Sequence, residues 1–167
     1  MKLFTTLKKM YDRLEEGLIA ALIAATTLII FYQVVMRYVF HDSPAWSEEI
    51  ARFMFVWESW LGVSLAPKYG KHIKIEAVTA RLTGKKLAVM NIIADVITGL
   101  ICIVLVFYGS KVVDLILMLG QTSSATGFPM WIVYLACPLS CALMIFRLIG
   151  DIKTQVFLLK NEIKEAI

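Results

Sequence analysis

The sequence predicts an all-α integral membrane protein with four transmembrane helices, both chain ends in the cytoplasm, and amphipathic helices at the membrane surface. Hydrophobic residues make up 59% of the chain and charged residues only 18%, and the mean hydropathy of +0.75 lies outside the range of ordinary soluble domains. The apolar residues also gather in runs of about 20, the length of a membrane span. The 167 residues therefore form one membrane domain (1–167), with no room for a soluble catalytic domain.

The first predicted span covers residues 17–36, which contain no charged side chain. A run of this length crosses a hydrocarbon core of about 30 Å. It is too long for a cleaved signal peptide and is not followed by small residues suited to cleavage. Residues 1–16 place apolar and charged side chains on opposite sides of a helix, which predicts an interfacial helix ahead of the span.

The second predicted span covers residues 46–66, whose length as a helix is about 31 Å. Pro67 ends this helix. Residues 68–86 follow with six basic side chains and one acidic one, and their apolar side chains are spaced to lie on the cytoplasmic membrane surface. A third span is predicted at 87–108 and a fourth at 128–146, where Pro138 predicts a kink.

The basic residues predict the orientation, because cytoplasmic segments retain Lys and Arg. The N-terminal segment, the 68–86 segment and the C-terminal segment hold four, six and four of them, which is fourteen in all. The opposite side holds Arg37 and Lys111 only. This imbalance indicates membrane topology rather than nucleic-acid binding as the origin of the net charge of +4.

Charged side chains near the outer end of the second span form the main candidate site. Glu48 and Arg52 are four residues apart and share one helix face, which predicts an intrahelical ion pair. Arg37 ends the first span on the same side and can reach Glu48 or Glu49 across the short turn. We predict one structural ion cluster that joins the first two spans in the geometry a partner recognises: Arg37, Glu48, Glu49 and Arg52.

Two acidic residues lie deeper, roughly 12–14 Å from the cytoplasmic ends of their helices. Glu58 and Asp95 can be hydrogen-bonded packing residues, a proton or cation site, or contacts to a partner protein. We favour the partner, because the sequence offers no basic residue assigned to that depth.

The aromatic residues fall into two groups, one near the outer membrane interface and one within the second span. Trp46 and Trp131 lie near the outer membrane interface and predict interface anchors. Four others in the second span can either pack internally or form a flat docking face for a partner: Phe53, Phe55, Trp57 and Trp60.

The sequence contains no arrangement typical of an enzyme, a metal site or a cofactor site. His41 and His72 stand alone in predicted loops, so they cannot serve as axial haem ligands within a span. Cys102, Cys137 and Cys141 lie in apolar runs and are interpreted as small packing residues. A small four-helix proton-coupled exporter is the alternative class, but such proteins are shorter and carry their acid in the first span.

A more specific pattern runs from Gln33 to about Glu76. It consists of Arg37-Tyr38-Val39-Phe40, Trp46-Ser47-Glu48-Glu49, Arg52, Phe55-Val56-Trp57, Gly62 and Lys71-His72-Ile73. This pattern resembles the small, DctQ-like membrane subunit of tripartite ATP-independent periplasmic (TRAP) transporters. Glu76 is a mild departure, since Asp is more usual there.

The resemblance implies a multi-pass subunit of the bacterial inner membrane, without a cofactor or enzymatic activity. It implies two protein partners: a large DctM-like membrane subunit with the substrate and sodium sites, and a DctP-like extracytoplasmic binding protein. The transported substrates would be organic acids such as C4-dicarboxylates, sialic acids or other sugar acids. The subunit itself would anchor the large subunit in the lipid bilayer as a scaffold.

Overall fold

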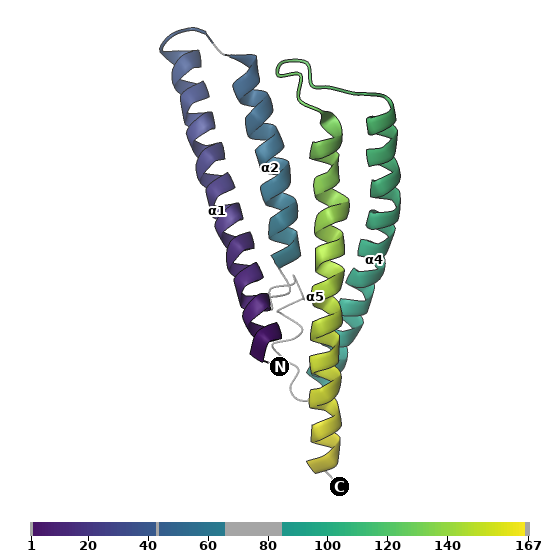
Figure 1. Cartoon of the computed structure of the whole chain (residues 1–167). Helices are drawn as coiled ribbons and strands as arrows, with labels where there is room; N and C mark the ends of the chain where they lie inside the picture. Colours follow the sequence, from purple (N-terminus) through teal and green to yellow (C-terminus); the bar gives the residue numbers. More distant parts are fainter. Residues whose placement is uncertain (1, 43, 66–84, 166–167) are drawn as a thin grey trace. The chain divides into compact units, whose positions relative to one another are not determined.

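The computed structural model of the chain describes residues 2–42, 44–65 and 85–165 (Figure 1). Within these residues it contains four helices and no strand beyond an isolated bridge in a loop. The all-α prediction is thus confirmed for the described residues. Most of the predicted basic segment 68–86 lies outside them. The helices are α1 (Lys2–Tyr38), α2 (Ala45–Leu65), α4 (Lys85–Met118) and α5 (Met130–Glu165).

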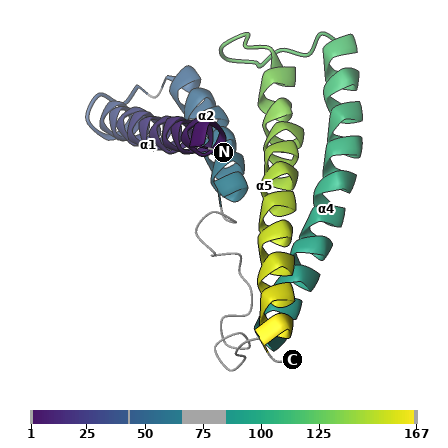
Figure 2. The same cartoon turned by 60° about the horizontal axis from the view of Figure 1, so that its bottom comes forward.

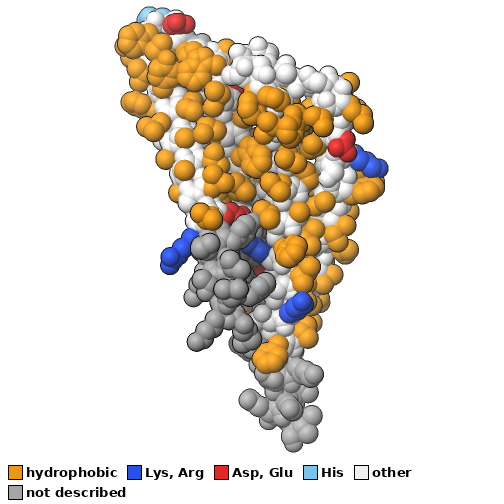
Figure 3. Space-filling view, viewed as in Figure 1, with side chains coloured by type: hydrophobic (Ala, Val, Ile, Leu, Met, Phe, Trp, Pro, Cys, Tyr) orange, Lys and Arg blue, Asp and Glu red, His pale blue; other side chains and the backbone are white. Residues whose placement is uncertain are grey.

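Three of the described helices are long and apolar enough to cross a membrane. The candidate spans are Arg13–Tyr38, Leu87–Met118 and Met130–Phe157. Helix α2 is not among them, since four of its 21 residues are charged. Hydrophobic side chains are spread along the helices over the described surface in the face seen in Figure 3, with few charged side chains among them. Such a surface is suited to contact with lipid or with another apolar protein surface.

The chain divides into two compact units. The first contains Met1–Gly62 and Val113–Ala136, and the second contains Val63–Val112 and Cys137–Ile167. Helices α2, α4 and α5 each contribute residues to both units, so each unit is described separately below.

In the first unit, α1 and α2 run antiparallel, side by side (Figures 1 and 2). His41 follows α1 with a positive φ of 56°, a left-handed conformation that turns the chain. The backbone N–H of Asp42 donates to the carbonyl of Met36 at 3.1 Å and closes the turn. The short connection of residues 39–44 therefore keeps the end of α1 next to the start of α2.

Helix α1 is one continuous helix of 37 residues, about 55 Å long. The sequence predicted an interfacial helix at 1–16 and a separate span from residue 17. No proline or helix-ending sequence separates these two segments, and a single glycine inside a helix costs only about 1 kcal/mol. Gly17 therefore lies within α1 without breaking it.

Helix α4 continues to Met118, ten residues beyond the predicted end of the third span. It ends where Gly120 adopts a φ of 59°. The N–H of Gly120 donates to the carbonyl of Leu117 at 3.1 Å, and the N–H of Gln121 donates to the carbonyl of Ile116 at 3.3 Å. This is the hydrogen-bond pattern of a Schellman motif, which uses glycine at the left-handed position.

In the second unit, α4 and α5 pack antiparallel (Figures 1 and 2). Sγ of Cys102 lies 3.6 Å from Sδ of Met144. A Cβ added to Gly109 would lie 3.4 Å from the ring of Pro138. Since Gly109 has no side chain, the Pro138 ring can pack directly against the backbone of α4.

Candidate functional site

Glu48 lies at the centre of an ion cluster at the turn between α1 and α2. Its Oε2 atom is 3.6 Å from Nη2 of Arg37, and its Oε1 atom is 3.1 Å from Nη2 of Arg52. Nε2 of Gln33 also donates to Oε2 of Glu48 at 3.5 Å. The side chains of Arg37, Glu48 and Arg52 are 51%, 53% and 68% exposed in the isolated chain. Each exposed pair contributes only about 0.2–1 kcal/mol in water.

The cluster forms one end of a groove between α1 and α2. The groove has a volume of about 460 Å³. Its charged end lies at the turn, while Ile30 and Phe55 lie seven residues further along their helices, about 10 Å deeper. We call this cavity the Arg37 groove; its walls are Ile30, Gln33 and Arg37 from α1, and Glu48, Ala51, Arg52 and Phe55 from α2.

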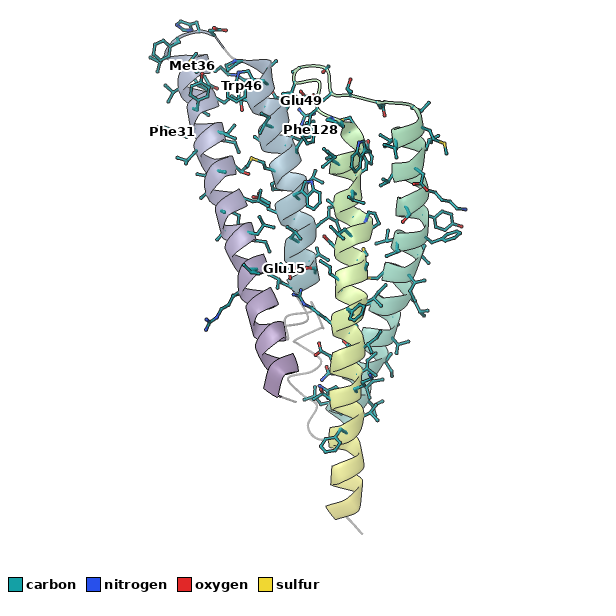
Figure 4. All side chains as sticks on the ribbon, in the orientation of Figure 1. Glu15, Phe31, Met36, Trp46, Glu49 and Phe128 are labelled. Atoms are coloured by element: carbon teal, nitrogen blue, oxygen red, sulfur yellow. The ribbon has the colours of Figure 1, made fainter. Side chains whose placement is uncertain are left out.

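Glu49 points to a different part of the structure, the loop between α4 and α5 (Figure 4). Its Oε2 atom accepts hydrogen bonds from the backbone N–H groups of Ala125, at 3.1 Å, and Thr126, at 2.9 Å. The Thr126 hydroxyl donates to the same oxygen at 3.1 Å. Consecutive residues of a helix project about 100° apart, so Glu48 and Glu49 serve different contacts.

The structure therefore places the four predicted cluster residues in two sets. Arg37, Glu48 and Arg52 lie together in the groove, while Glu49 holds the α4–α5 loop. The contact between Glu49 and Thr126 was not predicted from the sequence, because the two residues lie 77 positions apart and no local pattern links them.

The four predicted docking aromatics do not share one face of α2. Phe53 and Trp57 line an apolar cavity of about 320 Å³, in which Phe128 also takes part. The rings of Phe53 and Phe128 are 5.9 Å apart. Phe55 instead lines the Arg37 groove. Positions 53 and 55 differ by about 200° around a helix, which explains the separation. Trp60 is half-buried in the same helix.

The two predicted interface anchors lie at helix starts. Trp46 is in the first turn of α2, where its ring centroid is 5.9 Å from that of Tyr32 in α1 (Figure 4). Trp131 is half-buried at the start of α5. These positions are compatible with the predicted anchoring role.

Glu58 and Asp95 belong to different units. Glu58 is half-buried, and its Oε2 atom accepts a hydrogen bond of 3.4 Å from the Thr26 hydroxyl in α1. Asp95 is buried in α4, with 3% of its surface exposed. A Cβ added to Gly99 would lie 3.9 Å from the Leu148 side chain, and Cys102 lies beside Met144. These positions set an antiparallel register that puts Asp95 opposite residues 151–152 of α5.

A buried arginine was missed by sequence reasoning. Arg147 of α5 is 8% exposed, and its Nη1 atom donates to the carbonyl of Ser64 at 2.6 Å and to the Ser64 hydroxyl at 3.3 Å. Ser64 lies at the C-terminal end of α2, where helix carbonyls commonly accept hydrogen bonds from groups outside the helix. Along this register Arg147 lies four to five residues, slightly more than one helical turn, from the level of Asp95.

No group of three His, Cys, Asp or Glu residues able to hold a metal ion occurs among the described residues. The three cysteines are free thiols in α4 and α5, and Cys102 and Cys141 are buried.

Comparison with known proteins assigns the chain to a family. Residues 26–158 match the family "Tripartite ATP-independent periplasmic transporters, DctQ component". The chain is 32% identical over 148 residues (85% of the chain) to the isethionate TRAP transporter permease protein DctMQ of Oleidesulfovibrio alaskensis. It is 30% identical over 150 residues (84% of the chain) to the sialic acid TRAP transporter permease protein SiaT of Haemophilus influenzae.

A third relative is shorter. The C4-dicarboxylate TRAP transporter small permease protein DctQ of Rhodobacter capsulatus is 27% identical over 169 residues, covering 83% of this chain and 74% of that protein. In contrast, the chain spans only 23% of the length of DctMQ and of SiaT. On the extent of the family match, the chain belongs to the DctQ family of TRAP transporter small permease components, multi-pass proteins of the bacterial inner membrane.

Proposed function

We propose that the chain is the small membrane subunit of a sodium-driven, binding-protein-dependent transporter for an organic acid, and that it acts as a scaffold for a large transport subunit. The observation that carries this proposal is the family match over residues 26–158. Two relatives contain the matching region within a much longer permease protein. This supports a role beside a larger membrane component, and family membership favours it over the small-exporter alternative.

The proposal includes a topology of four spans with both ends in the cytoplasm. Helix α2 is the fourth span: its 21 residues have a length of about 31 Å, enough to cross a hydrocarbon core. Charges inside a membrane need partners. Glu48 and Arg52 pair with each other, Glu49 accepts hydrogen bonds from the α4–α5 loop, and Glu58 accepts one from Thr26. These contacts lower the free-energy cost of burying α2.

The scaffold role assigns transport chemistry to the other components. The DctM-like subunit would carry the substrate and sodium sites, and the DctP-like binding protein would deliver the substrate. The three relatives described above are named for isethionate, sialic acid and C4-dicarboxylates, which are all organic acids. Exposed apolar side chains on α1 and α4, among them Leu28, Phe31 and Leu100, offer the surface that lipid or the large subunit would cover.

Deletion of this chain tests the scaffold role. Uptake of the organic acid into cells or reconstituted vesicles should be abolished, while the affinity of the purified binding protein for its ligand stays unchanged. Returning the chain from a plasmid should restore uptake. Full uptake by the purified large subunit and binding protein alone would contradict the proposal.

A further inference from the structure

The Arg37 groove has a polarity gradient along its length. Two guanidinium groups and one carboxylate lie at the α1–α2 turn, so the charged end has a net charge of +1. The opposite end is formed by Ile30 and Phe55, which are 46% and 59% exposed in the isolated chain. A groove that is cationic at the level of the headgroups and apolar about 10 Å deeper matches the shape and polarity of a membrane lipid.

We propose that the Arg37 groove binds one anionic phospholipid, with its phosphate between the guanidinium groups of Arg37 and Arg52 and an acyl chain along Ile30 and Phe55. The site lies in the outer leaflet in the orientation proposed above, and goes beyond the scaffold role because it needs no transport partner. Guanidinium groups are well suited to phosphate, since each presents five donors in a planar fork. The volume of about 460 Å³ is within the range of small-molecule sites.

Glu48 has a distinct role in this site. Its carboxylate lies 3.6 Å from Arg37 and 3.1 Å from Arg52, so it occupies the position between the two cations that a phosphate would approach. Glu48 lowers the net positive charge at the charged end of the groove and competes with the lipid phosphate for the two arginines. Glu48 also lies in the first turn of α2, where the partial positive charge at the N-terminus of the helix stabilises a carboxylate.

This gives Glu48 and the arginines opposite expected effects. The full chain, purified with its membrane partners, is placed in bilayers containing phosphatidylglycerol and phosphatidylcholine, and the bound lipids are counted by mass spectrometry. Arg37→Gln and Arg52→Gln should each lower bound phosphatidylglycerol about 1.4- to fivefold, the range for an exposed ion pair. Glu48→Gln should raise it. Lys111→Gln removes a basic residue of α4 that does not line the Arg37 groove; it is the matched control and should change nothing.

A second measurement does not depend on charge variants. A photoreactive benzophenone amino acid in place of Phe55 should crosslink to a phospholipid, which is identified by the added mass. Crosslinking to protein alone would overturn the proposal and assign the groove to a partner subunit. A loss of bound phosphatidylglycerol in Glu48→Gln equal to that in the arginine variants would also overturn it, since the three residues would then form an ion network that only maintains the fold.

Discussion

Two adjacent acidic residues, Glu48 and Glu49, have different partners. Glu48 pairs with arginines, while Glu49 accepts three hydrogen bonds at one oxygen from Ala125 and Thr126. Convergent N–H and O–H donors of this kind bind anions strongly because each bond is charge-assisted. We infer that Glu49 keeps the α4–α5 loop in one conformation.

The variant Glu49→Gln tests this inference. Loss of the negative charge weakens all three bonds, so the amides of Ala125 and Thr126 should exchange hydrogen several times faster, as measured by mass spectrometry in detergent. Glu48→Gln removes the same charge one residue away and should leave exchange in the loop unchanged. Equal effects of the two variants would mean that a general loss of charge near the start of α2, rather than this contact, controls the loop.

A second prediction about a single residue concerns Arg147. The variant Arg147→Met keeps most of the side-chain volume but leaves the buried Ser64 carbonyl without its donor, at a cost of about 1–3 kcal/mol. The melting temperature should fall by about 2–4 °C for each kcal/mol lost in a chain of this size. Lys153→Met, at an exposed basic position of the same helix, should have little effect. Equal melting temperatures for Arg147→Met and the unmodified chain would show that another group satisfies the carbonyl.

Sequence reasoning reached some of these contacts and missed others for a clear reason. The pair of Glu48 and Arg52 follows from a spacing of four residues on a helix, and the contact of Arg37 with Glu48 follows from a short turn. The bonds of Glu49 to Thr126 and of Arg147 to Ser64 join residues 77 and 83 positions apart. Contacts of such separation depend on tertiary packing, for which a single sequence has no local pattern.

At the scale of whole helices, the type of element was predictable, and the predicted span at 46–66 agrees with α2 to within one residue at its start, but the lengths of the other three helices were not predicted. The apolar runs that predicted spans lie in α1, α4 and α5, but each helix extends beyond its predicted span. Hydropathy indicates which part of a helix can lie in hydrocarbon, whereas helix ends depend on local backbone signals such as the left-handed Gly120. Charged residues such as Lys111 and Asp114 end an apolar run without ending a helix.

The packing of α4 on α5 can be tested with a substitution at Gly109. In Gly109→Leu the added Cβ would already be in van der Waals contact with the Pro138 ring at 3.4–3.6 Å, so the larger leucine side chain should crowd the interface between the helices. Overpacking of this kind typically costs about 1–3 kcal/mol. Gly62→Leu is the control in the isolated chain, because a Cβ at Gly62 meets no described atom within 4 Å. Thermal unfolding in detergent should distinguish the two variants; if both unfold at the same temperature, close contact at Gly109 does not stabilise the pair.

For the whole molecule, the central prediction is the topology. Single cysteines at Lys85 and Lys160, in a variant without native cysteines, should react only with reagents that reach the cytoplasm. A cysteine at Ser124 should react with a membrane-impermeant reagent from outside; this position is exposed, whereas the neighbouring Ser123 is buried. The excess of basic residues in the N-terminal, 68–86 and C-terminal segments supports this orientation. Labelling of Ser124 from the cytoplasm would contradict the four-span arrangement.

The pairing of α1 with α2 also affects how the chain enters the membrane during synthesis. Helix α2 has four charged side chains, and a charged residue such as arginine at the centre of a span costs about 2.5–3.5 kcal/mol on insertion. The contacts of Arg37 with Glu48 and of Thr26 with Glu58 become available only after α1 has been made. In the four-span arrangement, the two helices should therefore leave the translocon together as a preformed hairpin, with α1 acting as an intramolecular chaperone for α2. Exchange of residues 17–37 for an unrelated apolar span should leave α2 accessible to protease in newly made chains, although the first span still inserts.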